Sequence, residues 1–203
     1  MLKRLRDEVI FPSIIWELNN GDWSNFSINL GYFDFIDNDF IAWLERRVKQ
    51  WEIKPEKITF ELLEWKWPNK DNKEVFSNLK KLREMWFKIA MDDYWAWDSG
   101  GWRLAELLEL WLIDYIKIDK KIIERLWSND SRVRRTAISM IKWVVELANI
   151  WWPNWTVKVV AEYIKDDEIF RRAEELWVHL FQWYYFSPPL KPLDFKEKFI
   201  PMY

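Results

Sequence analysis

The sequence predicts an α/β fold, a (β/α)₈ TIM-type barrel that is incomplete at its N-terminal side. From residue 26 onward, short runs rich in β-branched and aromatic residues alternate with longer amphipathic segments, which is the pattern of βα units. Each predicted strand is apolar until its C-terminal end and then presents a polar side chain, and such ends meet at one face of a barrel. A doubly wound sheet would more often gather its ligands at one switch point. Six strands are two short of a barrel, so the missing units are expected upstream of Met1.

The six strands are predicted from short apolar runs. FSINL, KITFELLE and FKIAMDD come first, and their C-terminal halves carry an amide or acids. DYIKID and TVKVVAE end in Asp119 and Glu162, and VHLFQ ends in Gln182. Runs of this kind are typical of buried parallel strands. The predicted strands span residues 26–30, 57–64, 87–93, 114–119, 156–162 and 178–182.

The segments between the strands are longer and have the apolar periodicity of helices that cover a sheet. Lys and Arg are spread among Asp and Glu, as on solvated helix faces. We expect one domain over residues 1–190 and a C-terminal tail over 191–203. The predicted helices span residues 37–50, 72–85, 102–110, 119–126, 131–149 and 166–176.

Composition excludes several classes of protein. The net charge is −2, so no basic field favours a DNA partner. Cysteine is absent, which excludes disulfides and thiolate metal sites and fits a reducing compartment. The apolar run over 11–16 is interrupted by Pro12 and Ser13, and it is too short for a signal segment or a membrane span. We expect a cytoplasmic domain, although segments upstream of Met1 could anchor the full-length protein in a membrane.

Tryptophan is overrepresented and glycine is rare. The chain has 18 Trp and 4 Gly, whereas a usual glycine content of about 7% would give about 14. Several Trp stand between a predicted helix and a strand, where a C-cap glycine is typical, and others stand in short loops. We hypothesise that UGA means glycine in this organism and was translated as tryptophan; a genuinely Trp-rich protein is the alternative. The positions concerned are Trp51, Trp86, Trp95, Trp97, Trp177 and Trp183.

The polar strand ends predict a metal site. Asn29, Glu61, Asp92, Asp93 and Glu162 all offer oxygen ligands. With no Cys and one His in the chain, such a set suits Mg²⁺ or Mn²⁺ better than Zn²⁺. The adjacent acids at 92 and 93 could bridge two metals or divide between them, an arrangement used for in-line displacement at a phosphoester.

The order and spacing of these motifs resemble the EAL-domain family of cyclic di-GMP phosphodiesterases, from about residue 10 to residue 190. SINL resembles the family strand with a metal-binding Asn, and ITFELLE resembles its E-(I/L)-T-E strand. MDDYWAWDSG resembles the family's DDFGTGYSS loop, and IDYIKID resembles its (D)-x-(I/L)-K-I-D strand. VVAEYIKDDE and FQWYYFSPPL resemble VVAEGVET and QGYYFSKPL. The six tryptophans named above all fall on glycines that are usual in the family.

The resemblance implies metal ligands and a reaction. Asn29, Glu61 and Asp92 would bind a first metal, and Asp92 would bridge to a second, held also by Asp93 and Glu162. The implied reaction is hydrolysis of one phosphodiester of cyclic di-GMP to linear pGpG, with Mg²⁺ or Mn²⁺ in a two-metal site. Cyclic di-GMP is thus the implied ligand, with a homodimer and an upstream sensory or GGDEF domain as further partners.

The resemblance also implies catalytic residues. Lys117 would hold or polarise the attacking water, with Asp119 beside it. Glu64 would brace the loop after the acidic pair, and Gln182 would support the substrate or the water.

Three departures from the family pattern leave alternatives open. The E-A-L segment, whose Glu is a metal ligand, is absent and would precede Met1, so the 203-residue chain alone is expected to have little or no activity. Tyr163 stands where the family has Gly, and Lys165 stands where it has a second Glu. These departures favour a non-catalytic relative that binds cyclic di-GMP or a protein partner, whereas the otherwise intact site set favours the enzyme. An unrelated metal-dependent barrel hydrolase is a third, weaker interpretation.

Overall fold

The computed structural model describes residues 10–20, 25–63, 73–94, 100–150, 157–190 and 194. Six parallel strands form one sheet in the order β1-β2-β3-β4-β5-β6, so each strand pairs with the next one in the sequence. A doubly wound sheet reverses this order at a switch point, whereas a barrel does not. The predicted fold class is therefore confirmed: the sheet is an incomplete barrel with β1 and β6 as its edge strands. The strands are β1 (Phe26–Leu30), β2 (Ile58–Leu63), β3 (Lys88–Tyr94), β4 (Tyr115–Ile118), β5 (Lys158–Ala161) and β6 (Leu180–Phe181).

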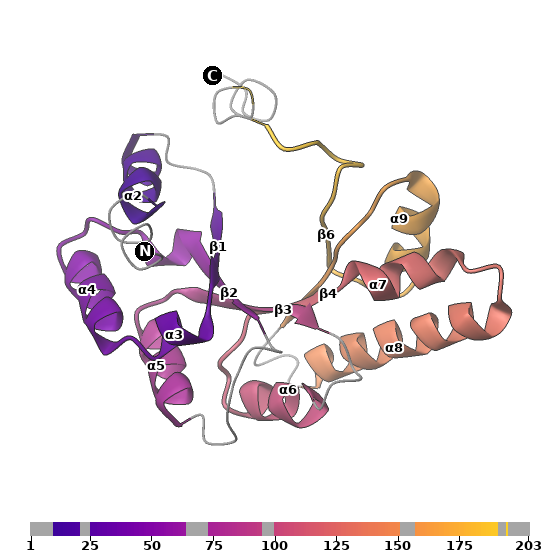
Figure 1. The fold of residues 1–203 in the computed structure, drawn as a ribbon, viewed down its shortest axis with the longest axis horizontal. Helices are drawn as coiled ribbons and strands as arrows, with labels where there is room; N and C mark the ends of the chain where they lie inside the picture. Colours follow the sequence, from indigo (N-terminus) through magenta and orange to yellow (C-terminus); the bar gives the residue numbers. More distant parts are fainter. Residues whose placement is uncertain are drawn as a thin grey trace.

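The helices lie around the outside of this sheet, and β1 and β6 stand on either side of its open part (Figure 1). Each strand from β1 to β5 is followed by at least one helix before the next strand begins. None of the described helices is long and apolar enough to cross a membrane. The helical elements are α2 (Phe11–Asn20), α3 (Tyr32–Phe35), α4 (Asn38–Lys49), η2 (Pro55–Lys57), α5 (Lys73–Glu84), α6 (Gly100–Glu109), α7 (Lys120–Ile123), η4 (Glu124–Trp127), α8 (Ser131–Asn149) and α9 (Asp167–Glu174).

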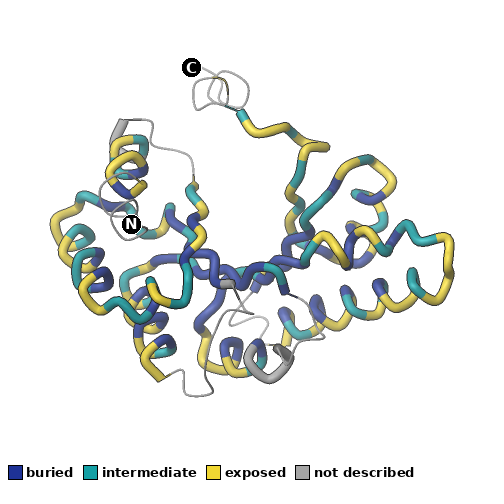
Figure 2. The backbone as a smooth tube through the Cα atoms, viewed as in Figure 1, coloured by how far each residue is buried: buried dark blue, intermediate teal, exposed yellow. Residues whose placement is uncertain are grey.

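The hydrophobic core lies between the sheet and the inner faces of the helices (Figure 2). Alternate strand residues such as Phe60, Ile89 and Ile116 are fully buried there, because successive side chains of a strand point to opposite faces. Apolar helix residues such as Leu44 and Leu79 meet them from the other side. This packing leaves the other face of the strands free to carry polar side chains at the carboxyl ends.

Aspartates begin four of the helices. The side chains of Asp37, Asp119, Asp130 and Asp166 each accept a hydrogen bond from a backbone N–H in the first turn that follows. This capping satisfies N–H groups that have no partner within the helix. The predicted helix over 119–126 is divided into α7 and η4, and the chain turns between η4 and α8 at Ser128 and the cap Asp130.

Helix α2 differs from the expectation from sequence, in which Pro12 and Ser13 interrupt the apolar run over 11–16. Pro12 is the second residue of α2, and the chain is helical on both sides of it. Phe11 and Ile14 are buried, and the Phe11 ring packs edge-on against Phe40 and Trp43 with centroids 5.4 Å apart in both pairs. Helix α2 therefore contributes to the core.

Four helices end in the same kind of turn before the next strand. At the end of α5, the Trp86 N–H donates to the Arg83 carbonyl at 2.9 Å, and the Phe87 N–H donates to the Leu82 carbonyl at 3.1 Å. This is the Schellman motif, in which the first residue after the C-cap is left-handed and is usually glycine. The four left-handed residues and their φ angles are Trp51 (59°), Trp86 (74°), Trp111 (59°) and Trp177 (63°).

These turns confirm a glycine-type backbone at three of the predicted positions and add Trp111, which the sequence reasoning missed. At Trp183 φ is 158°, which is close to extended backbone. The backbone at this position therefore does not distinguish glycine from tryptophan. Trp95, Trp97 and the tail over 191–203, apart from Asp194, lie outside the described residues.

A cluster of ion pairs lies at the amino ends of β3 and β4, opposite the polar carboxyl ends of the strands. Asp114, just before β4, pairs with Arg83 from α5 and with Lys88 Nζ at 3.4 Å, and it accepts a hydrogen bond from the Ile89 N–H at 2.8 Å. Asp114 is 9% exposed. The cluster joins the α5–β3 and α6–β4 junctions, and a buried, fully paired carboxylate of this kind is a structural element.

Candidate functional site

The parallel register of the strands brings polar side chains to one end of the sheet. Asn29 on β1 lies opposite Glu61 on β2, and Leu63 at the end of β2 lies opposite Asp92 on β3. The ladder between β3 and β4 shifts register between Met91 and Tyr94. Such an irregularity re-aims side chains near the end of a strand, here beside the acidic pair.

Lys117 on β4 is the centre of the site. Its Nζ lies 2.7 Å from Glu61 Oε2, 2.7 Å from Asp92 Oδ1 and 2.9 Å from Glu162 Oε1. The side chains of Glu61, Asp92 and Lys117 are nearly buried, and Glu162 is 16% exposed. One ammonium therefore connects carboxylates from β2, from β3 and from the residue that follows β5.

Glu61 has a second partner that sequence reasoning missed. The hydroxyl of Ser27, two residues before Asn29 on β1, donates to Glu61 Oε1. Ser27 lies on the same face of β1 as Asn29, because side chains two apart share a face of a strand. The alternation in FSINL, with Ile28 and Leu30 buried, was the signal that could have identified Ser27.

Asp92, Asp93 and Glu162 form the described group of acids that could hold a metal ion. Each offers a carboxylate oxygen, and these atoms lie within 4.8 Å of one another. Asp93 reaches this position with a left-handed backbone, φ 52°, a conformation that Asp tolerates better than most residues do. Asp92 Oδ1 is buried without a hydrogen bond of ordinary geometry, although it lies in the ion pair with Lys117.

The electrostatics of the site follow from burial and from the excess of acids. Burial alone would lower the pKa of Lys117, but its close contacts with Asp92 and Glu61 and the charge of Glu162 raise the pKa well above its ordinary value. Burial raises the pKa of Glu162 despite the opposing effect of Lys117. Burial also raises the pKa of Asp93, with Asp92 and Asp119 adding to the effect. Lys117 is thus held as a cation among acids whose charge it does not fully offset.

The other predicted site residues are placed less centrally. Asp119 caps α7, with its carboxylate accepting from the Lys121 N–H at 2.6 Å. Asn29 is exposed on β1, on the same face as Ser27. Gln182 follows β6 with an exposed side chain, and its backbone pairs with Ala161 and Ile164. Glu64 lies outside the described residues.

The two departures from the family pattern lie next to Glu162. Tyr163 is left-handed, φ 63°, which is the conformation expected where glycine is usual. The Lys165 Nζ lies 4.2 Å from the ring centroid of Trp127 and 5.6 Å from that of Tyr163. The charge of Lys165 is therefore placed against aromatic rings, and its contacts differ from those of Lys117.

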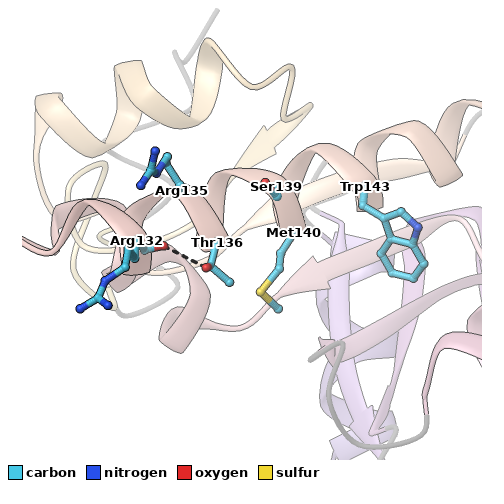
Figure 3. Close-up of a pocket in the computed structure, with 6 residues that line it drawn as sticks. All are labelled: Arg132, Arg135, Thr136, Ser139, Met140 and Trp143. Atoms are coloured by element: carbon cyan, nitrogen blue, oxygen red, sulfur yellow. Dashed lines mark hydrogen bonds between the residues drawn. The ribbon is translucent and has the colours of Figure 1, made fainter.

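A pocket elsewhere on the surface does not belong to this site. Its lining residues all come from α8, and the hydrogen bond drawn among them is from Thr136 Oγ1 to the Arg132 carbonyl, 2.9 Å long (Figure 3). A hollow along one helix lacks the converging polar groups from several elements that mark a ligand site. It is lined by Arg132, Arg135, Thr136, Ser139, Met140 and Trp143.

The donor set of the site fits a hard divalent cation. Glu61, Asp92, Asp93 and Glu162 supply four carboxylates against the single ammonium of Lys117. A cluster of buried or partly buried acids with excess negative charge is stabilised when a bound cation offsets that charge. Carboxylate oxygens without thiolates or imidazoles match Mg²⁺ or Mn²⁺.

The chain is similar in sequence and in fold to known proteins. The cyclic di-GMP phosphodiesterase PdeB of Shewanella oneidensis is 22% identical over 202 residues, which are 98% of this chain and 22% of that protein. An EAL domain protein of Listeria monocytogenes has a similar structure, with a TM-score of 0.73 and 25% identity over 97% of this chain and 73% of that one. The manganese and cyclic di-GMP complex of Klebsiella pneumoniae BlrP1 has a TM-score of 0.70 and 24% identity over 91% of this chain and 44% of that one.

The chain spans about a fifth of the length of the curated relative. The sequence model of the EAL domain matches residues 9–189, which include every described strand and every predicted site residue. The resemblance seen in the strand motifs is thus confirmed across nearly the whole chain, and the chain belongs to the EAL domain family.

Proposed function

We propose that this chain is a phosphodiesterase domain that hydrolyses cyclic di-GMP to linear pGpG with Mg²⁺ or Mn²⁺, and that residues 1–190 form the domain. One observation carries the proposal: Glu61, Asp92 and Glu162, from three strand ends, converge on Lys117 within 2.9 Å. The names of the PdeB relative and of the BlrP1 complex support the substrate, because both refer to cyclic di-GMP.

The roles of the residues follow from their positions. Glu61, Asp92, Asp93 and Glu162 would hold two divalent cations, with Asn29 completing the first ligand set. Bound cations would supply charge stabilisation at the phosphate oxygens and a more acidic water. Lys117, kept protonated by its neighbours, would orient that water or stabilise negative charge on the phosphate. Asp119, Glu64 and Gln182 would brace the surrounding loops and the substrate.

The test is turnover by the protein expressed from its native gene, including any segment encoded upstream of Met1. We expect pGpG to form with Mg²⁺ or Mn²⁺. Ca²⁺ should inhibit, because its larger and looser ligand shell misplaces the attacking water. Asp92→Asn and Glu162→Gln should each reduce the rate at least about 100-fold, the scale on which precisely placed electrostatic groups act.

A matched control separates chemistry from folding. Asp114 is a carboxylate with the same burial as Asp92, 9% against 8% exposed, but it lies at the opposite end of the sheet. Asp114→Asn should lower stability and leave the turnover of the folded fraction unchanged. Equal losses of turnover in the Asp92 and Asp114 variants would contradict the assigned site.

A receptor that binds cyclic di-GMP without hydrolysing it is the second candidate. Tyr163 and Lys165 favour it, because they stand where the family has Gly and Glu. The position of the Lys165 ammonium against the Trp127 ring supports the enzyme, since that charge is directed at aromatic groups. If the protein binds cyclic di-GMP without turnover and Lys165→Glu restores turnover, the receptor is the correct assignment.

A further inference from the structure

The four Schellman turns form a repeated feature in which one residue type occupies one position. In addition to the turn at Trp86, the N–H groups of Trp51, Trp111 and Trp177 donate to the carbonyl three residues earlier, at 2.9 to 3.0 Å. The N–H of the next residue donates to the carbonyl five residues earlier in each turn, at 2.9 to 3.3 Å. Each turn lies between a helix and the next strand, and each has Trp at the position that is usually glycine in this motif.

Tryptophan is a poor residue for this backbone. A left-handed φ is uncommon for any residue other than glycine and is an outlier for a bulky one, because Cβ approaches the following carbonyl oxygen. Apart from Trp183, six of the described residues other than glycine have positive φ, and four of these are tryptophan. Trp is about 9% of the sequence (18 of 203), so chance placement does not account for this concentration.

The side chains at these turns gain little in return. Trp51, Trp86 and Trp177 are 91%, 74% and 80% exposed, and Trp111 is 44% exposed. A tryptophan retained for stability is normally buried, because its large apolar ring gains most by leaving water. The residues that follow the four are mostly core residues, such as Phe87 and Leu112. The turns are therefore required by the fold, whereas the indole rings are not.

Trp43 shows what a packed tryptophan looks like in this protein. It lies within α4, its ring stacks with that of Phe40 at 6.3 Å, and the Phe11 ring meets it edge-on at 5.4 Å. The Arg47 guanidinium lies 5.2 Å from its centroid. The chain thus contains two groups of tryptophan that differ in backbone, exposure and packing.

We propose that glycine occupies positions 51, 86, 111 and 177 in the protein that the organism makes, and that position 43 is tryptophan. The codon UGG means tryptophan, and UGA differs from it only in the third base. A gene in which UGA encodes glycine therefore shows tryptophan at glycine positions when UGA is translated as tryptophan. The assignment is independent of the proposed function, because the four positions lie at the ends of helices and away from Lys117.

Two measurements test the identity of the residues. The gene should have UGA at codons 51, 86, 111 and 177 and UGG at codon 43. Mass spectrometry of peptides from the native protein should find glycine at the four positions and tryptophan at 43. A UGG codon with a tryptophan mass at any of the four overturns the assignment there, and the same result at all four overturns the proposal.

A stability measurement tests the physical reasoning independently of the gene. In a recombinant chain with tryptophan throughout, Trp→Gly at each of the four positions should raise the folding equilibrium constant about fivefold, the effect of removing one left-handed bulky residue. Trp51 and Trp86 line the same pocket, so these two changes can couple, and the four changes together should raise the folding equilibrium constant at least about a hundredfold. The change in stability is measured as a shift of the denaturant midpoint, provided that the m-value stays the same.

Trp43→Gly is the matched control, since it makes the same change at a packed helical position. It should lower the folding equilibrium constant at least tenfold, because it removes the contacts with Phe11 and Phe40 and places glycine inside a helix. A fall in the midpoint for the fourfold variant, comparable to that for Trp43→Gly, would overturn the proposal. Either result is obtained without any activity assay, so it remains separate from the test of cyclic di-GMP hydrolysis.

Discussion

Lys117→Met should strongly destabilise the metal-free protein. The Nζ atom lies 2.7 to 2.9 Å from three carboxylates, and each contact contributes an attraction of about 6 kcal/mol at an effective dielectric constant of about 20. Desolvation of the ions offsets much of this attraction, and removal of one partner of a buried pair typically costs about 3–5 kcal/mol. Protonation of the remaining acids limits the loss, so we expect about 3 kcal/mol, a large part of the 5–15 kcal/mol of a typical domain.

The variant should also respond more strongly to Mn²⁺ than the wild-type protein does. Without the ammonium, a divalent cation alone offsets the charge of Glu61, Asp92 and Glu162. A ligand at 100 times its dissociation constant stabilises a fold by about 2.7 kcal/mol, so saturating Mn²⁺ should recover most of the lost stability. The assay is chemical denaturation of both proteins with and without MnCl₂.

Arg83→Met provides the control for this experiment. Arg83 pairs with Asp114, and the two side chains are 17% and 12% exposed, so its removal also takes a cationic partner from a nearly buried carboxylate, which keeps Lys88 and the Ile89 N–H. It should destabilise the protein without any rescue by Mn²⁺, because one carboxylate at the other end of the sheet does not form a cation site. Equal responses of the Lys117 and Arg83 variants to Mn²⁺ would refute the reasoning.

Two further predictions concern single side chains. Asp93→Asn should raise the denaturation midpoint of the metal-free protein and remove most of its stabilisation by Mn²⁺. Burial and neighbouring acids raise the pKa of Asp93 and make its charge unfavourable, and Asn also tolerates a φ of 52°. A lower midpoint for the variant would contradict this prediction. His179 Nδ1 accepts the Val159 N–H at 3.0 Å, and burial, with a contribution from Lys158, lowers the pKa of His179. The unfolded chain therefore takes up a proton first, and stability should fall as the pH drops below about 6.5. His179→Asn, whose amide oxygen also accepts a hydrogen bond, should reduce the difference in midpoint between pH 7.5 and pH 5.5; an unchanged difference would remove this role.

Much of the fold is predictable from local pattern. The strand FSINL and the helix over 131–149 have the predicted bounds, because in both cases the apolar periodicity ends at a polar or capping residue. Asp92, Glu162 and Lys117 were found as polar endings of apolar runs, and parallel pairing brings such endings together. Their meeting at one ammonium is not predictable from spacing, because it depends on side-chain direction and on the register shift in β3.

Other features escaped because a sequence gives no backbone dihedral angles. Trp111 stands in the run LLELWLID, where it reads as one more apolar residue, and only its φ of 59° distinguishes it. The sequence pattern treats Pro12 as an interruption, whereas Pro12 lies within helix α2. The resemblance implies a catalytic role for Asp119, and the structure places Asp119 as the N-cap of the helix that follows. From sequence alone, an acidic residue after a strand is equally consistent with a catalytic group and with a helix N-cap.

Parallel strands divide the molecule into two rims with different vulnerabilities. The carboxyl rim holds Lys117 and its acids, and the amino rim holds the Asp114 ion pairs and the four tight turns. Substitutions at the amino rim therefore change the fraction of the protein that folds. They have little effect on the catalytic rate of each folded molecule. Low activity or poor solubility of a recombinant chain with tryptophan at the four turns would thus reflect a low yield of folded protein. Rates must be normalised to the folded fraction before any loss of chemistry is assigned to Tyr163 or Lys165.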